Sequence, residues 1–321
     1  MTTDVIPLGT SSAVPTDERH LSALAIERKG QVLLFDCGEG TQYRLREAGL
    51  SWARIDAIFV THLHGDHCYG LPGLLSTMDL QQRTAPVTLV LPPGGAALLR
   101  AVPGVAPERL SFPVHVVEGD AALGPSAAYE ADEVVVDARR LDHGEAVSMG
   151  FRVEERMRPG RFDPEQARAL GVPEGPAFGR LQRGNPVTTP DGTTVNPAQV
   201  LGPPRPGVAV AYVTDTRPCD GGRVLAEEAD LLYHDATFAD DHAARAHETG
   251  HSTARQAATV AREAGAGRLL LGHLSARYPD PTPLEREARS VFSAAAVAEE
   301  LRRYELDPRE KEPPVDLTDE S

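Results

Sequence analysis

The chain has 321 residues, of which 41% are hydrophobic and 25% are charged, with a formal net charge of -15. A chain of this size can bury a substantial core, and its longest apolar runs are far shorter than the roughly 20 residues that span a bilayer, which excludes a transmembrane helix. The negative charge disfavours a nucleic-acid ligand unless basic residues gather locally, so the distribution of charge matters more than its sum.

The N-terminal half alternates short strands with helices. Apolar runs bounded by Gly, Pro and Ser predict the strands, and helical periodicity predicts the helices. Strands are expected at 5–8, 23–27, 32–36, 57–60, 87–91, 114–117, 134–141 and 149–154, with helices at 71–80 and 95–101.

The same alternation resumes near residue 208, after an insertion. The insertion, about residues 156–206, is rich in Pro and Gly and has little periodicity, so we expect an arm or lid outside the core. Residues 152–185 carry seven arginines against five acids, which makes this one of the few stretches that are not acidic. Beyond it we expect strands at 208–213, 231–234 and 268–271, with helices near 222–228, at 253–264 and at 284–301.

The N-terminus and the cysteines indicate the compartment, and the C-terminal residues have a composition of their own. The N-terminus has no basic and apolar signal pattern, and Cys37, Cys68 and Cys219 are widely spaced with no CxxC pair. We therefore expect a cytoplasmic protein with three small buried cysteines and no disulfide. Residues 299–321 hold nine acidic and four basic side chains, and we expect 306–321 to be an acidic, disordered tail.

The strongest chemical signal is Thr-His-Leu-His-Gly-Asp-His at 61–67, directly after the predicted strand 57–60. Its four candidate metal ligands are His62, His64, Asp66 and His67. They can converge only if the backbone turns sharply, and a glycine stands where such a turn is needed. Imidazole and carboxylate groups suit zinc. The alternative is that these histidines cap a helix or satisfy hydrogen bonds in the core, as a lone histidine usually does.

The HxHxDH pattern resembles the signature of the metallo-β-lactamase superfamily. The chain resembles the ribonuclease Z family further, to about residue 304. The segments that carry this resemblance are LGTSSAVP, FDCGEGTQ, THLHGDHCYGLPGLL, LDHG, PGRFD, GPAFGRLQRG, LGPPRPG, TDTRPC, HDATF, GHSTARQAA and HLSARY. The resemblance implies an α/β fold, a four-layer αββα sandwich over residues 1–305, with a protruding flexible arm at about 156–206.

The resemblance also implies two zinc ions per subunit. It assigns His62, His64 and His143 to one ion, Asp66, His67 and His273 to the other, and Asp215 to both. Manganese is an open alternative for these donors. Such a metal pair lowers the pKa of a bound water and stabilises charge on the attacking and leaving oxygens, so the expected nucleophile is a shared hydroxide whose proton Asp66 accepts. Taken singly, His143 and His273 could equally be structural.

The resemblance assigns the role of proton donor to His251, oriented by Asp235. Ser252 is a good N-cap for the following helix, and we expect the His251 ring beside that helix N-terminus, a place that binds phosphate. The alternative is a capping histidine without chemistry. The family usually has Glu where Asp235 stands, and often Lys and Asn in the loop that here carries Asp17 and His20.

The GPAFGRLQRG segment resembles the arm with which the family grips tRNA. Gly175, Gly179 and Gly184 suit a mobile loop. Arg180, Arg183 and Arg161 are the candidate RNA-binding residues, since arginine pairs well with phosphate. The alternative is a solvated loop that happens to carry arginines.

These features together predict a zinc-dependent endoribonuclease that cuts the 3′ trailer from precursor tRNA and leaves a 3′-hydroxyl on the tRNA and a 5′-phosphate on the trailer. A homodimer is expected from the resemblance, and no membrane partner. One alternative is a related hydrolase of small phosphodiesters, sulfate esters or thioesters, because the superfamily reuses one site for several substrates. Another is a metal-stabilised RNA-binding protein without turnover.

Overall fold

The structure is a computed structural model that describes residues 2–119, 123 and 127–308. The chain divides into two compact units. The first comprises residues up to Glu154 together with Val208–Asp307, and the second comprises Glu155–Gly207. The insertion therefore falls in the second unit, to which Pro308 also belongs.

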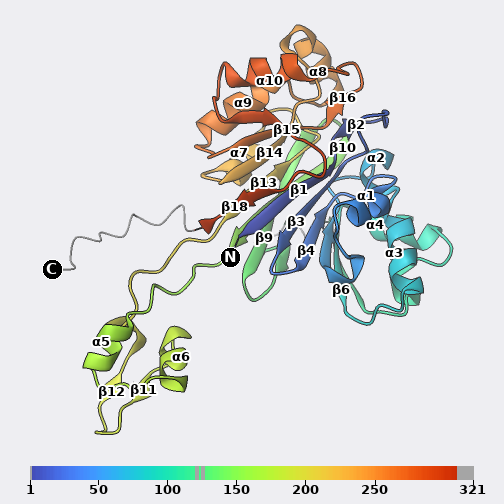
Figure 1. Cartoon of the computed structure of the whole chain (residues 1–321). Helices are drawn as coiled ribbons and strands as arrows, with labels where there is room; N and C mark the ends of the chain where they lie inside the picture. Colours follow the sequence, from blue (N-terminus) through green and yellow to red (C-terminus); the bar gives the residue numbers. More distant parts are fainter. Residues whose placement is uncertain (1, 120–122, 124–126, 309–321) are drawn as a thin grey trace. The chain divides into compact units, whose positions relative to one another are not determined.

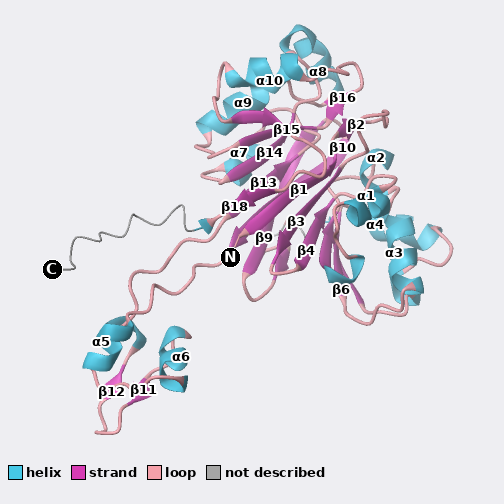
Figure 2. Cartoon of the chain, viewed as in Figure 1, coloured by secondary structure: helices cyan, strands magenta, loops and turns pink. Residues whose placement is uncertain are grey.

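Two mixed sheets, each with seven strands among the described residues, form the centre of the first unit. Figure 2 shows them as adjoining layers of strands with helices outside. The first sheet has the order β18 (Tyr304–Leu306), β1 (Thr3–Gly9), β3 (Ala23–Arg28), β4 (Gln31–Phe35), β5 (Ile55–Phe59), β6 (Val87–Leu91) and β7 (Val114–Glu118). The second has the order β17 (Ala295–Val297), β15 (Leu269–Gly272), β14 (Leu231–Asp235), β13 (Ala209–Val213), β10 (Ala146–Glu155), β9 (Val134–His143) and β8 (Tyr129–Glu130).

The central strands are apolar throughout because each sheet is covered on both faces. In β4, Phe35 points into the core between the sheets, whereas its neighbour Leu34 packs with the outer helices. In β13, Tyr212 and Val213 divide in the same way. This alternation is the period of two that a strand imposes on its side chains. The core between the sheets contains aromatic pairs, including the stacked rings of Phe35 and Phe59.

Helices cover the outer faces of both sheets, which completes the four-layer sandwich that the resemblance implies (Figure 1). One face carries α1 (Thr41–Glu47), α2 (Gly65–Cys68), α3 (Leu71–Leu80) and α4 (Gly95–Ala101). The other carries α7 (Asp220–Ala226), α9 (Ala254–Glu263) and α10 (Thr282–Arg289). Helix α8 (Ala243–Thr249) comes before α9 in the chain and buries Ala246. A short parallel pair, β2 (Ser11–Ser12) with β16 (Leu274–Ser275), joins the N-terminal loop to the segment after β15.

The expected helix at 284–301 is wrong. Helix α10 ends at Arg289, and the alanine-rich segment after it forms β17, whose parallel pairing with β15 buries Ala295. Alanine favours helix by propensity, but pairing with the open edge of a sheet outweighs that weak local preference. The chain then turns and runs back as β18, antiparallel to β1. That strand includes Leu306, so the expected tail begins too early, and residues 309–321 lie outside the described residues.

The second unit is more regular than its sequence suggests. It contains α5 (Pro164–Ala169), α6 (Pro176–Gln182) and the hairpin of β11 (Val187–Thr188) with β12 (Thr194–Val195). Its buried hydrophobic residues form a small cluster that is separate from the hydrophobic clusters of the first unit: Ala167, Val172, Leu181, Val187, Val195 and Val200.

The mobile loop expected around Gly179 is also wrong, because this residue lies inside α6. Gly175 and Gly184, with φ of 99° and 81°, stand just outside the helix ends. Pro176 at the first turn fits the same pattern, since proline starts helices and glycine stops them.

Two smaller expectations can be checked. No helix among the described residues is long and apolar enough to cross a membrane. All three cysteines are free, but only Cys37 and Cys68 are buried, because Cys219 stands at the N-cap of α7 and is partly exposed. The cytoplasmic location stays a prediction.

Candidate metal centre

The seven side chains expected to bind metal converge at one edge of the sandwich. Each follows or ends a strand of the first unit: β5, β9, β13 or β15. Three groups have ligand atoms within 4.8 Å of one another: His62, His64, His143 and Asp215; Asp66, His67 and His273; and Asp215, Asp235, His251 and His273.

Asp215 lies at the centre of the cluster. One carboxylate oxygen is 3.2 Å from Nε2 of both His67 and His273, and the other is 3.6 Å from His62 Nε2 and 3.7 Å from His143 Nε2. Asp215 is therefore in reach of histidines from both groups. This is the arrangement expected of a carboxylate that two cations share.

Left-handed backbone at strand ends aims several of these side chains. Asp36, Asp215 and His273 have φ of 57°, 52° and 55°. Residues other than glycine adopt this conformation at a cost of about 1–3 kcal/mol, and such strain gathers at functional sites. Gly65, expected to provide a sharp turn, instead has ordinary helical backbone as the first residue of α2. A Cβ there would lie 2.5 Å from the Tyr69 ring, so any other residue would displace that exposed side chain.

Hydrogen bonds at the far nitrogen fix the orientation of three rings. His67 Nδ1 donates to Asp36 Oδ2 at 2.8 Å, and His143 Nδ1 donates to the Gly250 carbonyl at 2.9 Å. His273 Nδ1 lies 2.9 Å from Thr237 Oγ1. In each ring Nε2 is left facing the cluster, which is how proteins hold histidines that bind metal.

Asp36 and Thr237 were not identified from the sequence. The buried Asp36 carboxylate accepts hydrogen bonds from the Thr61 amide, the Thr61 hydroxyl, His67 and the Tyr212 hydroxyl. One signal was available: Asp36 directly follows β4, which pairs in parallel with β5, so it must lie beside the HxHxDH turn. Thr237 offered no comparable signal.

The electrostatics of the cluster favour a bound cation. Burial lowers the pKa of His62 well below its usual value, so its ring is neutral, and Nε2 is buried without a hydrogen-bond partner among the described residues. Burial alone would raise the pKa of Asp215, but the surrounding histidines hold it well below its usual value. A neutral, unpartnered imidazole beside buried carboxylates is a donor set that fits zinc.

The group of Asp215, Asp235, His251 and His273 is better explained without a metal ion of its own. Asp235 is fully buried, and its oxygens accept four hydrogen bonds, from the Thr216 amide, the Thr237 amide, the Thr237 hydroxyl and His251 Nδ1. Its lone pairs are therefore occupied. Burial would lower the pKa of His251, but the Asp235 carboxylate 2.8 Å away outweighs it and raises this pKa to about 9. With this pKa the His251 ring carries a proton at neutral pH.

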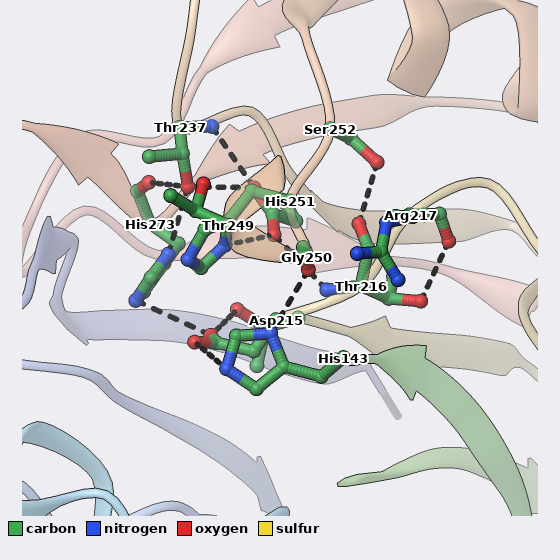
Figure 3. Close-up of polar contacts among 12 residues, drawn as sticks. His143, Asp215, Thr216, Arg217, Thr237, Thr249, Gly250, His251, Ser252 and His273 are labelled. Atoms are coloured by element: carbon green, nitrogen blue, oxygen red, sulfur yellow. Dashed lines mark hydrogen bonds and ion pairs between the residues drawn. The ribbon is translucent and has the colours of Figure 1, made fainter. Parts of the chain in front are cut away.

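His251 faces the cluster from the side of the second sheet (Figure 3). Its ring stacks on that of His273, with centroids 5.1 Å apart and planes at 24°. The expected cap at Ser252 is wrong, because Thr253 caps α9 through a reciprocal pair with Gln256. Ser252 instead donates to the Thr216 carbonyl, and this bond ties the His251 segment to the loop after Asp215.

The three candidate RNA-binding arginines lie in the second unit. Arg180 is in α6, Arg183 follows that helix directly, and Arg161 precedes α5. All three side chains are exposed. Arg180 donates to the Pro186 carbonyl at 3.1 Å, which keeps its guanidinium close to the hairpin.

Comparisons with known proteins identify the family of the chain. A profile described as a beta-lactamase superfamily domain matches residues 183–274, and one described as anti-Pycsar protein Apyc1 matches residues 3–100. The curated protein named ribonuclease Z from Salinibacter ruber is 85% identical over 100% of both chains. The one from Gemmatimonas aurantiaca is 46% identical over 93% of this chain and 94% of its own.

Solved structures show the same fold. The crystal structure of the short form of human tRNase Z is 29% identical, has a TM-score of 0.67, and covers 94% of this chain and 98% of that one. A metallo-beta-lactamase fold protein from Bacillus subtilis has the same TM-score at 18% identity, covering 95% and 100%, which bears on the fold alone. The four-layer sandwich described above is therefore the metallo-β-lactamase fold.

Proposed function

Because this chain belongs to the ribonuclease Z family, with a curated relative 85% identical over its whole length, we infer that it is a tRNA 3′-processing endoribonuclease. The products we propose are a tRNA with a 3′-hydroxyl and a trailer with a 5′-phosphate. One observation carries the proposal. The seven side chains that the family resemblance assigns to metal come together in one cluster, next to a histidine that can donate a proton.

The enzyme requires metal, and we propose two zinc ions per subunit. His62, His64 and His143 would hold one ion, Asp66, His67 and His273 the other, and Asp215 both. When bound, such a pair supplies a hydroxide nucleophile at neutral pH and stabilises charge on the phosphodiester oxygens. Elemental analysis of the purified protein distinguishes zinc from manganese, which the same donors accept.

Asp66 is proposed as the general base. One of its oxygens, Oδ2, accepts from the Ala13 amide at 2.9 Å and lies 3.5 Å from Nε2 of both His67 and His273. No hydrogen bond of Oδ1 occurs among the described residues, so that atom is the one we assign to the proton of the attacking water. Asp66 is partly exposed, as a base that must meet solvent and substrate has to be.

His251 is proposed as the general acid. Nδ1 is committed to Asp235, so the proton for the 3′ leaving oxygen comes from Nε2. The Asp235 carboxylate fixes the tautomer and the ring plane, and it also keeps the ring protonated. The shorter Asp at a position where the family usually has Glu therefore still reaches the ring, at 2.8 Å.

Binding of the tRNA body is proposed for the second unit. Arg161, Arg180 and Arg183 are exposed, and they offer guanidinium groups to phosphates in a chain that is otherwise acidic. We also propose a homodimer, supported by the family resemblance alone. Light scattering of the metal-loaded protein checks the oligomeric state.

The decisive experiment is incubation of the metal-assayed protein with a precursor tRNA, with the cut mapped to a single nucleotide. The proposal predicts multiple turnovers and one cut at the 3′ end of the tRNA body. A cut elsewhere in the RNA would contradict the proposed specificity, whereas hydrolysis of small esters only would support the alternative of a small-substrate hydrolase. Binding without turnover would leave only an RNA-binding protein. Deleting residues 160–185 should cripple tRNA cleavage while a small chromogenic diester is cut at almost the same rate.

A further inference from the structure

A buried carboxylate near the C-terminal end of the first unit is linked to the metal cluster through a loop. Glu300 lies in the turn between β17 and β18, and its side chain is only 9% exposed. Oε1 accepts from the Thr10 amide at 3.0 Å, the Thr10 hydroxyl at 3.2 Å and the His20 amide at 2.8 Å. Oε2 is 2.9 Å from His20 Nδ1 and accepts from Arg44 Nη2 at 3.0 Å.

Two of these partners, Thr10 and His20, are the ends of one loop. The Ser11 amide donates to the His20 carbonyl at 2.8 Å, so the loop closes on itself where Glu300 binds both ends. Two backbone amides, a hydroxyl, a ring nitrogen and a guanidinium all meet at this one carboxylate. Leaving the buried donors among them without an acceptor is unfavourable, so the loop closure relies on Glu300.

The middle of the same loop contacts a proposed metal ligand. The Ala13 amide donates to Asp66 Oδ2 at 2.9 Å, and it is the hydrogen bond that Asp66 receives from the backbone. Ala13 has a φ of 62°, a conformation that the loop must impose on a residue with a Cβ. The closed loop thus brings the Ala13 amide to the Asp66 carboxylate.

The loop also reaches the opposite side of the cluster. Arg19, whose side chain is buried, donates to the carbonyls of Ser275 and Tyr278 at 3.1 and 2.9 Å. Those residues follow His273 closely in the chain. The loop closed by Glu300 therefore spans from the ligand after β5 to the segment after β15.

We propose that Glu300 is a positioning residue for the metal centre, which closes the loop 10–20 so that the Ala13 amide fixes the Asp66 carboxylate. The inference rests on the role of Asp66 in the proposed function. The inference gives the loop 10–20 a part in the affinity for zinc. Glu300 touches neither a candidate ligand nor the reacting atoms, so its effect must pass through the loop.

The test is Glu300→Gln, with Glu299→Gln as the matched control. The glutamine keeps the shape and one oxygen for the Thr10 and His20 amides, but without the negative charge those hydrogen bonds are about half as strong. Its amide group also cannot accept from His20 Nδ1 or Arg44. Glu299 is the neighbouring residue, exposed and paired only with Arg302 among the described residues. Zinc affinity is measured by competition with a chromophoric chelator, and kcat/KM on a chromogenic diester.

Glu300→Gln should weaken one of the two zinc sites by up to about 10-fold, the lower end of what loss of a group that orients a ligand causes, because the glutamine weakens the loop closure without removing it. The chromogenic diester should be cut more slowly at low zinc, and excess zinc should restore its rate. Glu299→Gln should match the wild type. His20→Ala, which removes one partner of Glu300 at a half-exposed position, should weaken the same site by a smaller factor and serves if Glu300→Gln does not fold.

A double variant shows whether Glu300 acts on zinc affinity through Asp66. In an Asp66→Ala background, Glu300→Gln should cause no further loss of zinc affinity, because neighbouring groups that act as a unit are not additive. Wild-type affinity in both Glu300→Gln and His20→Ala, or a full additive loss in the double variant, would overturn the inference. A wild-type protein that binds two zinc ions but leaves precursor tRNA uncut would refute the proposed function and leave this test intact.

Discussion

The candidate metal cluster and the candidate RNA-binding arginines lie in contrasting surroundings. Five of the seven candidate ligands are buried, and three of the rings are fixed by a hydrogen bond at the far nitrogen. The three arginines are exposed on a unit with a small core of its own. Activating a water requires groups held in fixed geometry, whereas attraction to phosphates needs charge within reach. The two regions should therefore respond differently to substitution.

The largest effect is expected for Asp66→Ala. This change removes a proposed ligand and the proposed base together, so cleavage should fall by more than about 1,000-fold. The loss should be similar for precursor tRNA and for a chromogenic diester, because both need the same attacking water. Steady-state rates with equal metal loading measure it. Near wild-type cleavage of either substrate would remove the cluster from the mechanism.

His251→Ala should separate the two substrates. A 3′ alkoxide is a poor leaving group and needs a proton, so cleavage of precursor tRNA should fall about 100- to 1,000-fold. A nitrophenolate leaves without help, and the chromogenic diester should lose less than about tenfold. Asp235→Asn retains the ring but weakens its orientation, and it should lie between the wild type and His251→Ala. Equal losses on both substrates would mean that His251 serves the metal site and not the leaving group.

Most of the candidate metal cluster could be predicted from the sequence. His62, His64, Asp66 and His67 follow one another after a buried strand, and an apolar strand followed by polar residues marks a strand end even without the fold. The residues that orient these ligands could not be predicted. Asp36 acts on His67 from 31 residues away, and Glu300 on Thr10 from 290. Such pairs form only when the sheets pack, and no local pattern announces them.

The errors in secondary structure have the same cause. Residues 295–297 favour helix by composition, but they pair with β15 because that edge is open. In the insertion, α6 contributes one buried residue, Leu181, to a core of six residues, which is too few to produce a helical period in the sequence. Sequence patterns report local preference, and both cases were decided by distant partners.

The arginines should affect tRNA alone. The triple variant Arg161→Ala, Arg180→Ala, Arg183→Ala should lower kcat/KM for precursor tRNA roughly 10- to 100-fold, mainly through KM. The slope of log kcat/KM against log salt concentration should become shallower by up to about 3, one for each phosphate that a guanidinium no longer neutralises. Arg168→Ala is the control within the same unit, because that arginine already pairs with Glu174. A slope equal to the wild type would contradict phosphate binding by these residues.

The smallest change in catalysis, and the sharpest test of the contrast, is expected for Leu181→Ala. Leu181 is fully buried in the small core of the second unit, and its truncation should destabilise that unit by about 2–5 kcal/mol. Hydrogen exchange of the amides in α6 and in β11 should speed up, while zinc content and hydrolysis of a chromogenic diester stay unchanged. Cleavage of precursor tRNA should fall by no more than in the triple arginine variant, since unfolding the unit can only displace those arginines. If the diester rate fell as well, the metal centre would depend on the second unit, and catalysis and tRNA binding would not be separate functions of the two units.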